Sequence, residues 1–257
     1  MSMFILALRQ ARFDNRAFWR NPAAAFFTFV FPLMFLLIFN VAFGDEPLEL
    51  ERGDISPSTF FVPGIIAFSV INACYTNIAQ MVAFARDRGL LKRVRGTPLP
   101  TSAFLAGRVL QAVAVAVVLV VLVVTVGVVF YDVELPGGRL PAFVITLALG
   151  AAVFCTLGLA VSGLLPNADA APAVVNASIL PLLFISDVWI PMDNAPAWLT
   201  GVASLFPVVH FADALHTSFD PFETGSGFEV VDLAVLAAWG VAGAVVAVRF
   251  FTWEPRR

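Results

Sequence analysis

The stretch PAAAFFTFVFPLMFLLIFNVAF, residues 22–43, decides the fold class, because no charged side chain interrupts it. A helix needs about 20 predominantly apolar residues to cross the hydrocarbon core of a bilayer. The chain of 257 residues has the same character throughout, since 60% of it is hydrophobic, 13% is charged and its mean hydropathy is +0.91. About a quarter of the residues in a soluble domain are charged. We therefore expect an all-α integral membrane protein.

Five further stretches follow the same apolar pattern. The six predicted transmembrane helices cover about residues 22–43, 60–84, 109–130, 140–165, 171–190 and 231–251. We find no repeat among them and no linker long enough for a second domain. Residues 1–257 are therefore predicted to form a single transmembrane domain.

The basic residues are spread unevenly over the segments that connect these helices. Thirteen of the 15 lie in the N-terminal segment, around the segment after the second span, or at the C-terminal end. Arg52 and Arg139 fall on the opposite side, together with many acidic residues. Segments rich in lysine and arginine stay in the cytoplasm. We therefore expect both termini in the cytoplasm and a multi-pass protein of the cell membrane.

Two segments have the pattern of helices that do not span the bilayer. Residues 1–21 have an apolar face and, beside it, a basic stripe that consists of Arg9, Arg12, Arg16 and Arg20. Such amphipathic helices lie in the membrane interface and contact lipid headgroups. Residues 187–229 contain no lysine or arginine, and two short apolar stretches in them are separated by Pro207. We expect short extracellular re-entrant helices there, between the fifth and sixth spans.

The segment ARDRGLLKRVRGTPLP, residues 85–100, carries five basic residues, among them the only lysine of the chain, Lys92. It predicts a short helix in which Leu90, Leu91 and Val94 share an apolar face, ended by the prolines that follow. Two interpretations stay open. The charges set the membrane topology and contact anionic lipid, or the helix docks into a cytoplasmic partner.

Two sets of side chains are candidates for a substrate pathway. Phenylalanines recur every four residues along the first span, at Phe27, Phe31, Phe35, Phe39 and Phe43. The second span carries neutral polar side chains, which avoid lipid, at Asn72, Tyr75, Asn77 and Gln80. The ridge either packs against another helix or walls a lateral path. A path of this composition suits a hydrophobic or amphiphilic substrate.

Three stretches carry a resemblance to a known family. RDRGLLKRVRGTPLP, NPAAAFFTFVFPLMFLLIF and ILPLLFISDVWIPMDNAPAWLTGVASLFPVVHFADAL are similar to segments of the permeases of type-2 ABC exporters, in the family's order and over most of the chain. The chain departs from that pattern at three positions. Arg86 stands where glutamate is more frequent, Asp187 replaces a small glycine, and His210 stands where tyrosine is frequent.

The resemblance implies the transmembrane subunit of an ATP-driven exporter that moves a drug-like molecule or lipid outward, as in efflux and multidrug resistance. Export of a lipid-linked glycan or polymer is the alternative. Residues 85–100 would be a coupling helix for a separate ATPase. The residues implied are Arg86, Asp87, Arg88, Lys92 and Arg93 as its contacts and Leu91 and Val94 as the pair that packs into it, and Gly89 belongs to the same coupling set.

The implied partners are two ATP-binding subunits, which carry ATP and magnesium, and a second permease subunit, identical or related. This chain lacks the glycine-rich phosphate loop of an ATPase, so we expect no cofactor, no catalysis and no nucleic acid here. A distant alternative is a membrane enzyme using His210, Asp213 and His216 as zinc ligands. We expect no metal, because a further strong ligand is not evident.

Overall fold

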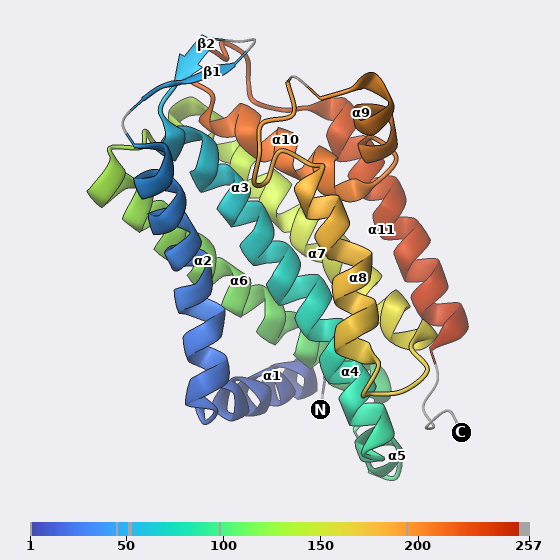
Figure 1. Cartoon of the computed structure of the whole chain (residues 1–257). Helices are drawn as coiled ribbons and strands as arrows, with labels where there is room; N and C mark the ends of the chain where they lie inside the picture. Colours follow the sequence, from blue (N-terminus) through green and yellow to red (C-terminus); the bar gives the residue numbers. More distant parts are fainter. Residues whose placement is uncertain (1, 45, 51–52, 98, 194, 252–257) are drawn as a thin grey trace.

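The structure is a computed structural model, and it describes residues 2–44, 46–50, 53–97, 99–193 and 195–251. Long helices form a bundle, crossed at its two ends by shorter ones (Figure 1). The helices are α1 (Met3–Trp19), α2 (Pro22–Phe43), α3 (Pro57–Ile71), α4 (Asn77–Asp87), α5 (Leu90–Arg95), α6 (Thr101–Tyr131), α7 (Leu140–Leu164), α8 (Ala171–Phe184), α9 (Ala197–Ala203), α10 (Pro207–Phe219) and α11 (Val230–Phe250). A two-stranded antiparallel hairpin, β1 (Leu48–Leu50) and β2 (Gly53–Ile55), joins α2 to α3.

Local sequence signals explain where the first two long helices begin. Asn21 caps α2 by accepting a hydrogen bond from the backbone N–H of Ala24 at 3.3 Å, and Ser56 caps α3 by accepting from Thr59 at 3.2 Å. Each cap is followed by a proline in the first turn, where its missing N–H costs no helical hydrogen bond. α2 ends at Gly44, whose φ of +64° favours glycine.

The second span is the centre of the bundle. α3 continues through a π-helical turn, Asn72–Thr76, into α4, so that residues 57–87 form one long helix. Within its most apolar window 83% of the residues are buried, against 11% for α2 and for α11. α3 and α4 therefore form the core, and α2 and α11 lie at the periphery.

Among the described residues, five helices are long and apolar enough to cross a membrane, or up to six if α9 and α10, which are bent by 96° to each other, count as one broken span. The expected all-α membrane fold is confirmed. The expected fifth span differs, since α8 ends at Phe184 after 14 residues. At 1.5 Å per residue it is shorter than the roughly 30 Å hydrocarbon core. A turn follows it, in which Asp187 has a φ of +53° and its carboxylate accepts from the Met192 N–H at 2.6 Å.

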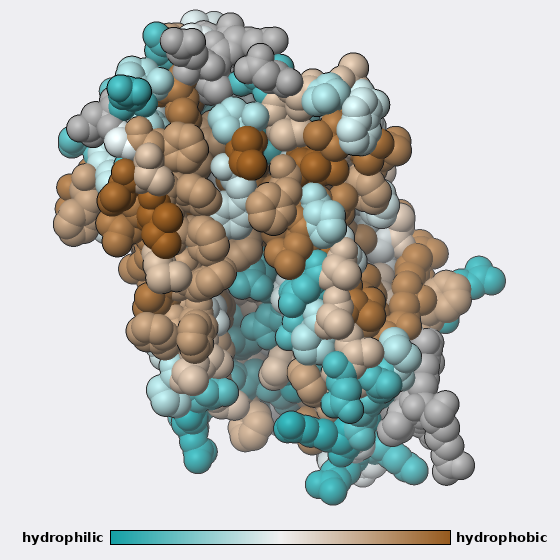
Figure 2. Space-filling model, viewed as in Figure 1, coloured by the Kyte–Doolittle hydropathy of each residue, from teal (hydrophilic) through white to brown (hydrophobic). Residues whose placement is uncertain are grey.

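Hydrophobic residues cover the middle of the molecule, and hydrophilic ones gather toward its two ends (Figure 2). The start of α1, the turn into α5 and the end of α11 lie at one end, and the β-hairpin, α9 and α10 lie at the other (Figure 1). The chain is a multi-pass membrane protein. That the α5 end lies in the cytoplasm stays a prediction from the distribution of basic residues, and the opposite end is called the outer end.

The segment between α8 and α11 holds two short helices, as expected, but α10 is not a surface helix. Phe211 is fully buried, its ring centroid lies 5.4 Å from that of Phe154 on α7, and its ring fills the space that a Cβ at Gly150 would need. α10 therefore crosses the outer part of the bundle, with its core face shielded from lipid, as irregular membrane elements require.

The assigned orientation predicts which cysteines an impermeant thiol reagent reaches in intact cells. We expect Gly225→Cys to be labelled from outside and Lys92→Cys only after the membrane is opened. The positions are exposed and lie near opposite ends of the bundle, while the native Cys74 and Cys155 are buried. Labelling of Lys92→Cys in sealed cells would reverse the topology.

Candidate functional site

The segment expected to couple to a partner is a corner formed by the end of α4 and by α5, at the end of the bundle that we predict to be cytoplasmic. Gly89, with a φ of +68°, ends α4 and turns the chain into α5, whose first turn closes through the Arg93 N–H and the Gly89 carbonyl. Leu91 is fully buried against Ala85 and Phe104. Leu90, Lys92 and Arg93 are exposed. α5 is therefore anchored by one leucine and presents an exposed basic face at this end of the bundle.

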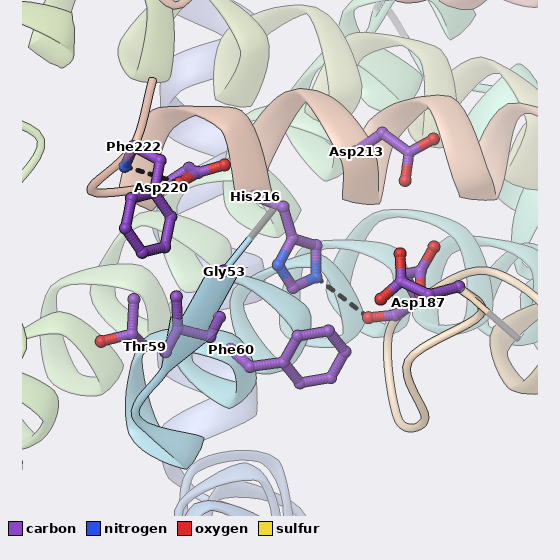
Figure 3. Close-up of a pocket in the computed structure, with 10 residues that line it drawn as sticks. Gly53, Thr59, Phe60, Asp187, Asp213, His216, Asp220 and Phe222 are labelled. Carbon is purple, nitrogen blue, oxygen red and sulfur yellow. Dashed lines mark hydrogen bonds between the residues drawn. The ribbon is translucent and has the colours of Figure 1, made fainter. Parts of the chain in front are cut away.

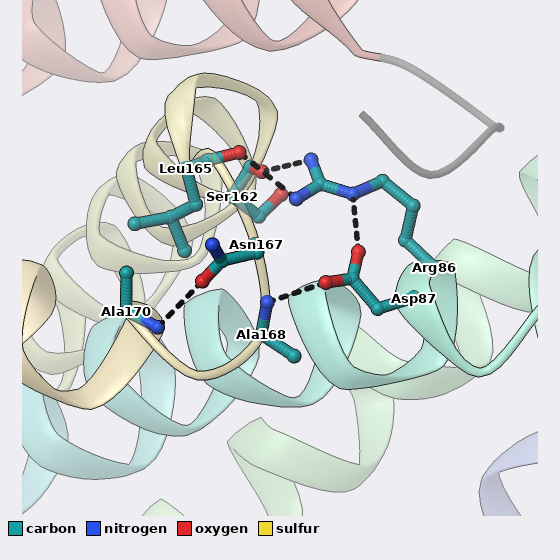
Figure 4. A network of polar contacts seen from close by, with 7 residues as sticks. All are labelled: Arg86, Asp87, Ser162, Leu165, Asn167, Ala168 and Ala170. Carbon is teal, nitrogen blue, oxygen red and sulfur yellow. Dashed lines mark hydrogen bonds and ion pairs between the residues drawn. The ribbon is translucent and has the colours of Figure 1, made fainter. Parts of the chain in front are cut away.

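Arg86 and Asp87, at the end of α4, hold the end of α7 and the loop that follows it (Figure 4). Arg86 donates from Nη1 to the Ser162 carbonyl at 3.1 Å, from Nη2 to the Leu165 carbonyl at 2.9 Å and from Nε to Asp87 at 3.2 Å. The other carboxylate oxygen of Asp87 accepts from the Ala168 N–H at 2.5 Å. Arg86 is 1% exposed.

The eight predicted coupling residues thus divide into two groups. Arg88, Lys92 and Arg93 are exposed, whereas Arg86 and Leu91 are buried within the chain and Val94 packs beside Leu91. The donors of Arg86 and the apolar surface of Leu91 are used within the chain, by the end of α7 and by α6, and their expected contact with an ATPase stays a prediction. Asp87 is half-buried in the same contacts, and Gly89 supplies the turn.

The phenylalanine ridge of α2 forms an aromatic cluster inside the chain. The ring centroid of Phe35 lies 4.8 Å from Trp189, and that of Phe39 lies 4.8 Å from Phe61 in a stacked arrangement. Phe31 and Phe43 extend the cluster to α3, while Phe27 is 65% exposed. Packing, the first interpretation of the ridge, therefore accounts for Phe35 and Phe39.

A cavity of about 240 Å³ opens between α2, α3 and α8. Figure 2 shows hydrophilic side chains on the floor of this hollow. Asn72, Thr76 and Asn176 meet there with Phe31, Phe68, Ile71, Ile179, Leu180 and Leu183. Among the described residues, we find no hydrogen bond to the side chains of Asn72, Thr76 or Asn176. The sequence identified Asn72 and Phe31, but it missed Thr76 and the whole contribution of α8.

The other polar residues of the second span lie outside that cavity. Tyr75 is buried, and its hydroxyl lies 2.6 Å from the Ser178 hydroxyl on α8. Asn77 and Gln80 are partly buried on α4 and do not line the cavity. Of the four predicted polar residues, Asn72 therefore lines the cavity and Tyr75 links the second span to α8. Asn77 and Gln80 lie elsewhere on α4.

A second hollow, of about 90 Å³, lies at the outer end between the β-hairpin, α3 and α10 (Figure 3). Its lining includes Asp187, Asp213, Asp220 and His216. The Nε2 of His216 lies 2.9 Å from the Asp187 carbonyl, and its ring lies 4.8 Å from that of Phe60. Across the part of the chain that the structure describes, no three histidine, cysteine or carboxylate side chains are arranged to hold a metal. The zinc interpretation therefore gains no support from the geometry.

His210 connects three outer elements. Its Nδ1 lies 2.6 Å from a carboxylate oxygen of Asp232 on α11, and its Nε2 lies 2.8 Å from the carbonyl of Ser204, which follows α9. Both neighbours are acceptors, and a neutral imidazole has only one N–H. Burial acts to lower the pKa of His210, but the hydrogen bonds and the charges of Asp232 and Asp213 outweigh it and raise the pKa above its ordinary value. The geometry suits the imidazolium form.

The contacts of His210 predict that the stability of the segment with α9 and α10 depends on pH. The contribution of His210 to stability is fully present below about pH 6.5, the unfolded pKa, and is lost as the pH rises through the raised folded pKa. We expect the melting temperature in detergent to fall more between about pH 6 and pH 9 for the wild type than for His210→Gln. Identical pH profiles for the two proteins would contradict this role.

A contact that the sequence did not predict fixes the N-terminal helix. α1 is amphipathic as expected, with Phe4 and Phe13 exposed, but its other face lies on α6. Asp14 forms an ion pair with Arg108 at 3.9 Å, and both side chains are about 10% exposed. A Cβ at Gly107 would lie 2.6 Å from Gln10. α1 is thus docked against α6 rather than held by lipid alone.

Comparison with known proteins agrees with this architecture. The sequence model of a family described as ABC-2 type transporter matches residues 4–219. The chain is 29% identical to a "Putative transport permease ycf38" of Pyropia yezoensis, over 74% of this chain and 65% of that protein. It is 26% identical to the "Inner membrane transport permease YadH" of Escherichia coli, over 75% of each. It is 27% identical to the "Probable multidrug ABC transporter permease YbhR" of the same organism, over 60% of this chain and 42% of that protein.

Proposed function

This chain belongs to the ABC-2 type transporter family, and from that premise we propose that it is the transmembrane subunit of an ATP-driven exporter in the cell membrane. A separate ATP-binding subunit, in two copies that carry ATP and magnesium, supplies the energy. A second permease subunit, identical or related, completes the pathway.

The observation that carries the proposal is the exposed face of α5. Arg88, Leu90, Lys92 and Arg93 project from a corner that Leu91 and the Arg86–Asp87 contacts hold firmly to the bundle. A signal for topology or lipid binding needs only charge, whereas a part that transmits force needs a rigid attachment as well. α5 has both the charge and the rigid attachment, which favours its role as the docking helix for the ATPase.

The cavity between α2, α3 and α8 supports a hydrophobic or amphiphilic substrate. Its walls are phenylalanine, leucine and isoleucine, and its polar groups are two neutral amides and one hydroxyl. Neutral hydrogen-bonding groups in an apolar hollow fix the orientation of a largely apolar ligand. The name of YbhR, a probable multidrug transporter permease, is in line with such a substrate. We propose drug-like molecules or lipids as the class.

Reversing two charges on α5 tests the docking proposal. We expect Lys92→Glu/Arg93→Glu to fold and to reach the membrane, since both side chains are exposed. Its binding to the ATP-binding subunit should weaken by roughly 100-fold or more, because like charges facing each other at an interface cost several kcal/mol. The measurement is co-purification of the ATPase from detergent-solubilised membranes, followed by titration of the purified subunits.

The matched control is Arg12→Glu/Arg16→Glu, which makes the same change in charge on two exposed residues of α1. It should retain the ATPase within a few-fold of the wild-type affinity. Equal retention by both double variants would refute docking through α5. Equal loss would show that the basic end attracts the ATPase only by its overall charge.

A further inference from the structure

The end of α7 has a backbone carbonyl that its own helix cannot satisfy. The last four carbonyls of an α-helix lack intrahelical partners, and for Ser162 the residue four positions on is Pro166, which has no N–H. Arg86 supplies donors to this carbonyl and to that of Leu165. A guanidinium with its forked donors also complements the negative end of the helix dipole. A side chain from α4 therefore caps α7.

The same corner holds the loop that leads into α8. Asp87 accepts from the Ala168 N–H, and within this loop the Asn167 side chain accepts from the Ala170 N–H at 2.8 Å, just before α8 begins. Figure 4 shows Arg86 and Asp87 side by side, the first directed to the end of α7 and the second to the loop. Two neighbouring residues thus tie α4 to both α7 and α8.

The contacts of Arg86 and Asp87 lie about one helical turn from α5. α5 begins three residues after Asp87, and Leu91 fixes it against Ala85 on α4 and Phe104 on α6. At its other end, α8 carries Asn176, Ile179 and Leu183 into the cavity wall and Ser178 into contact with Tyr75. A displacement of α5 therefore has a short, buried route to the wall of the cavity.

We infer that Arg86 and Asp87 are positioning residues that transmit movement of α5 to the end of α7 and to α8, in addition to the direct path through α4. This inference rests on the proposed function, because it assumes that a nucleotide-driven ATPase moves α5. Coupling of this kind requires a physical element that both sites bias. In this inference that element is the set of Arg86–Asp87 contacts, in which Arg86 is buried and Asp87 half-buried.

The test compares two reporter positions in the reconstituted complex of permease and ATPase. An environment-sensitive fluorophore is attached to Ala173→Cys on α8 or to Met81→Cys on α4, both exposed positions, while the native cysteines are buried. The signal is the change on adding magnesium ATP and vanadate. In the wild type we expect a change at both positions.

In Arg86→Gln the response at residue 173 should fall by roughly fivefold or more, the lower range of allosteric coupling, while that at residue 81 stays within about twofold of wild type. Arg86→Lys keeps the positive charge but lacks the forked N–H donors of the guanidinium, and it should retain only part of the response. Arg12→Gln removes an exposed guanidinium on α1, outside the proposed docking face, and it should leave the response at residue 173 unchanged. Asp87→Ala leaves the two bonds from Arg86 to the carbonyls of Ser162 and Leu165 and removes the acceptor for the Ala168 N–H, so it tests the same link if Arg86→Gln does not fold.

The outcomes separate the two proposals. No nucleotide response at either position in the wild type, or no binding of the ATPase, would overturn the proposed function itself. A wild-type response at residue 81 alone would overturn the inference and leave the function standing. Equal responses at residue 173 in the wild type and in a folded variant of Arg86 or Asp87 would also overturn the inference and leave the function standing.

Discussion

Replacing Gly158 with leucine is expected to destabilise the bundle more than any other single change considered for this chain. Gly158 on α7 faces the π-helical turn of the central helix, and a Cβ there would lie 2.8 Å from the Tyr75 carbonyl oxygen and 3.0 Å from that of Cys74. The neighbours are backbone atoms, so no rotamer change relieves the overlap. We expect a loss of about 3 kcal/mol or more, the upper range for overpacking.

The melting temperature in detergent, with size-exclusion profiles of the solubilised protein, measures this effect. The matched control is Gly201→Leu, the same substitution on exposed α9, where a Cβ meets nothing within 4 Å. It should leave the melting temperature within a few degrees of wild type. A Gly158→Leu protein as stable as the control would mean that α7 and the π-helical turn are not in close contact.

Removing the two central rings of the α2 ridge is expected to loosen α2 from α3. Phe35 and Phe39 contact Phe61, Phe68 and Trp189 with ring centroids 4.8 to 6.3 Å apart. Packing is the main force between helices in a membrane. A fully buried Phe→Ala change costs roughly 3–5 kcal/mol in soluble cores, and these half-buried rings should cost about 2 kcal/mol each.

Phe27→Ala is the comparison, because Phe27 belongs to the same ridge but is 65% exposed. We expect it to be nearly neutral for stability and Phe35→Ala/Phe39→Ala to lower the melting temperature clearly. If instead the double variant melts as the wild type does and only substrate preference changes, the ridge is a wall of the transport path. The aromatic cluster would then contribute little to the fold.

Much of the fold can be predicted from local sequence patterns, whose effect does not depend on tertiary contacts. The 22–43 stretch, the proline and glycine signals around α5 and the distribution of basic charge predict helices, ends and orientation by short-range rules. The end of α8 does not follow from such rules, since residues 171–190 are apolar throughout most of their length. The turn that stops α8 depends on the Asp187 carboxylate contact with Met192.

The coupling residues show why the site was only partly predictable. An apolar face on a six-residue helix can meet a partner or its own bundle, and only the contact of Leu91 with Phe104 decides between them. Arg86 looked like one more charge in a basic segment. A signal for its burial exists in the sequence, because Pro166 leaves the Ser162 carbonyl without its helical donor and a side chain or water has to supply one.

The most direct test of the account is a contact map of α5 in the assembled transporter. A photo-reactive amino acid is placed at Lys92, and at Arg16 of α1 as the control, and the adducts formed on illumination in native membranes are identified. The account predicts a covalent adduct between position 92 and the ATP-binding subunit, and far less ATPase adduct from position 16. Adducts of position 92 with lipid alone, or equal ATPase adducts from both positions, would contradict the assignment of α5 as the helix that docks the ATPase.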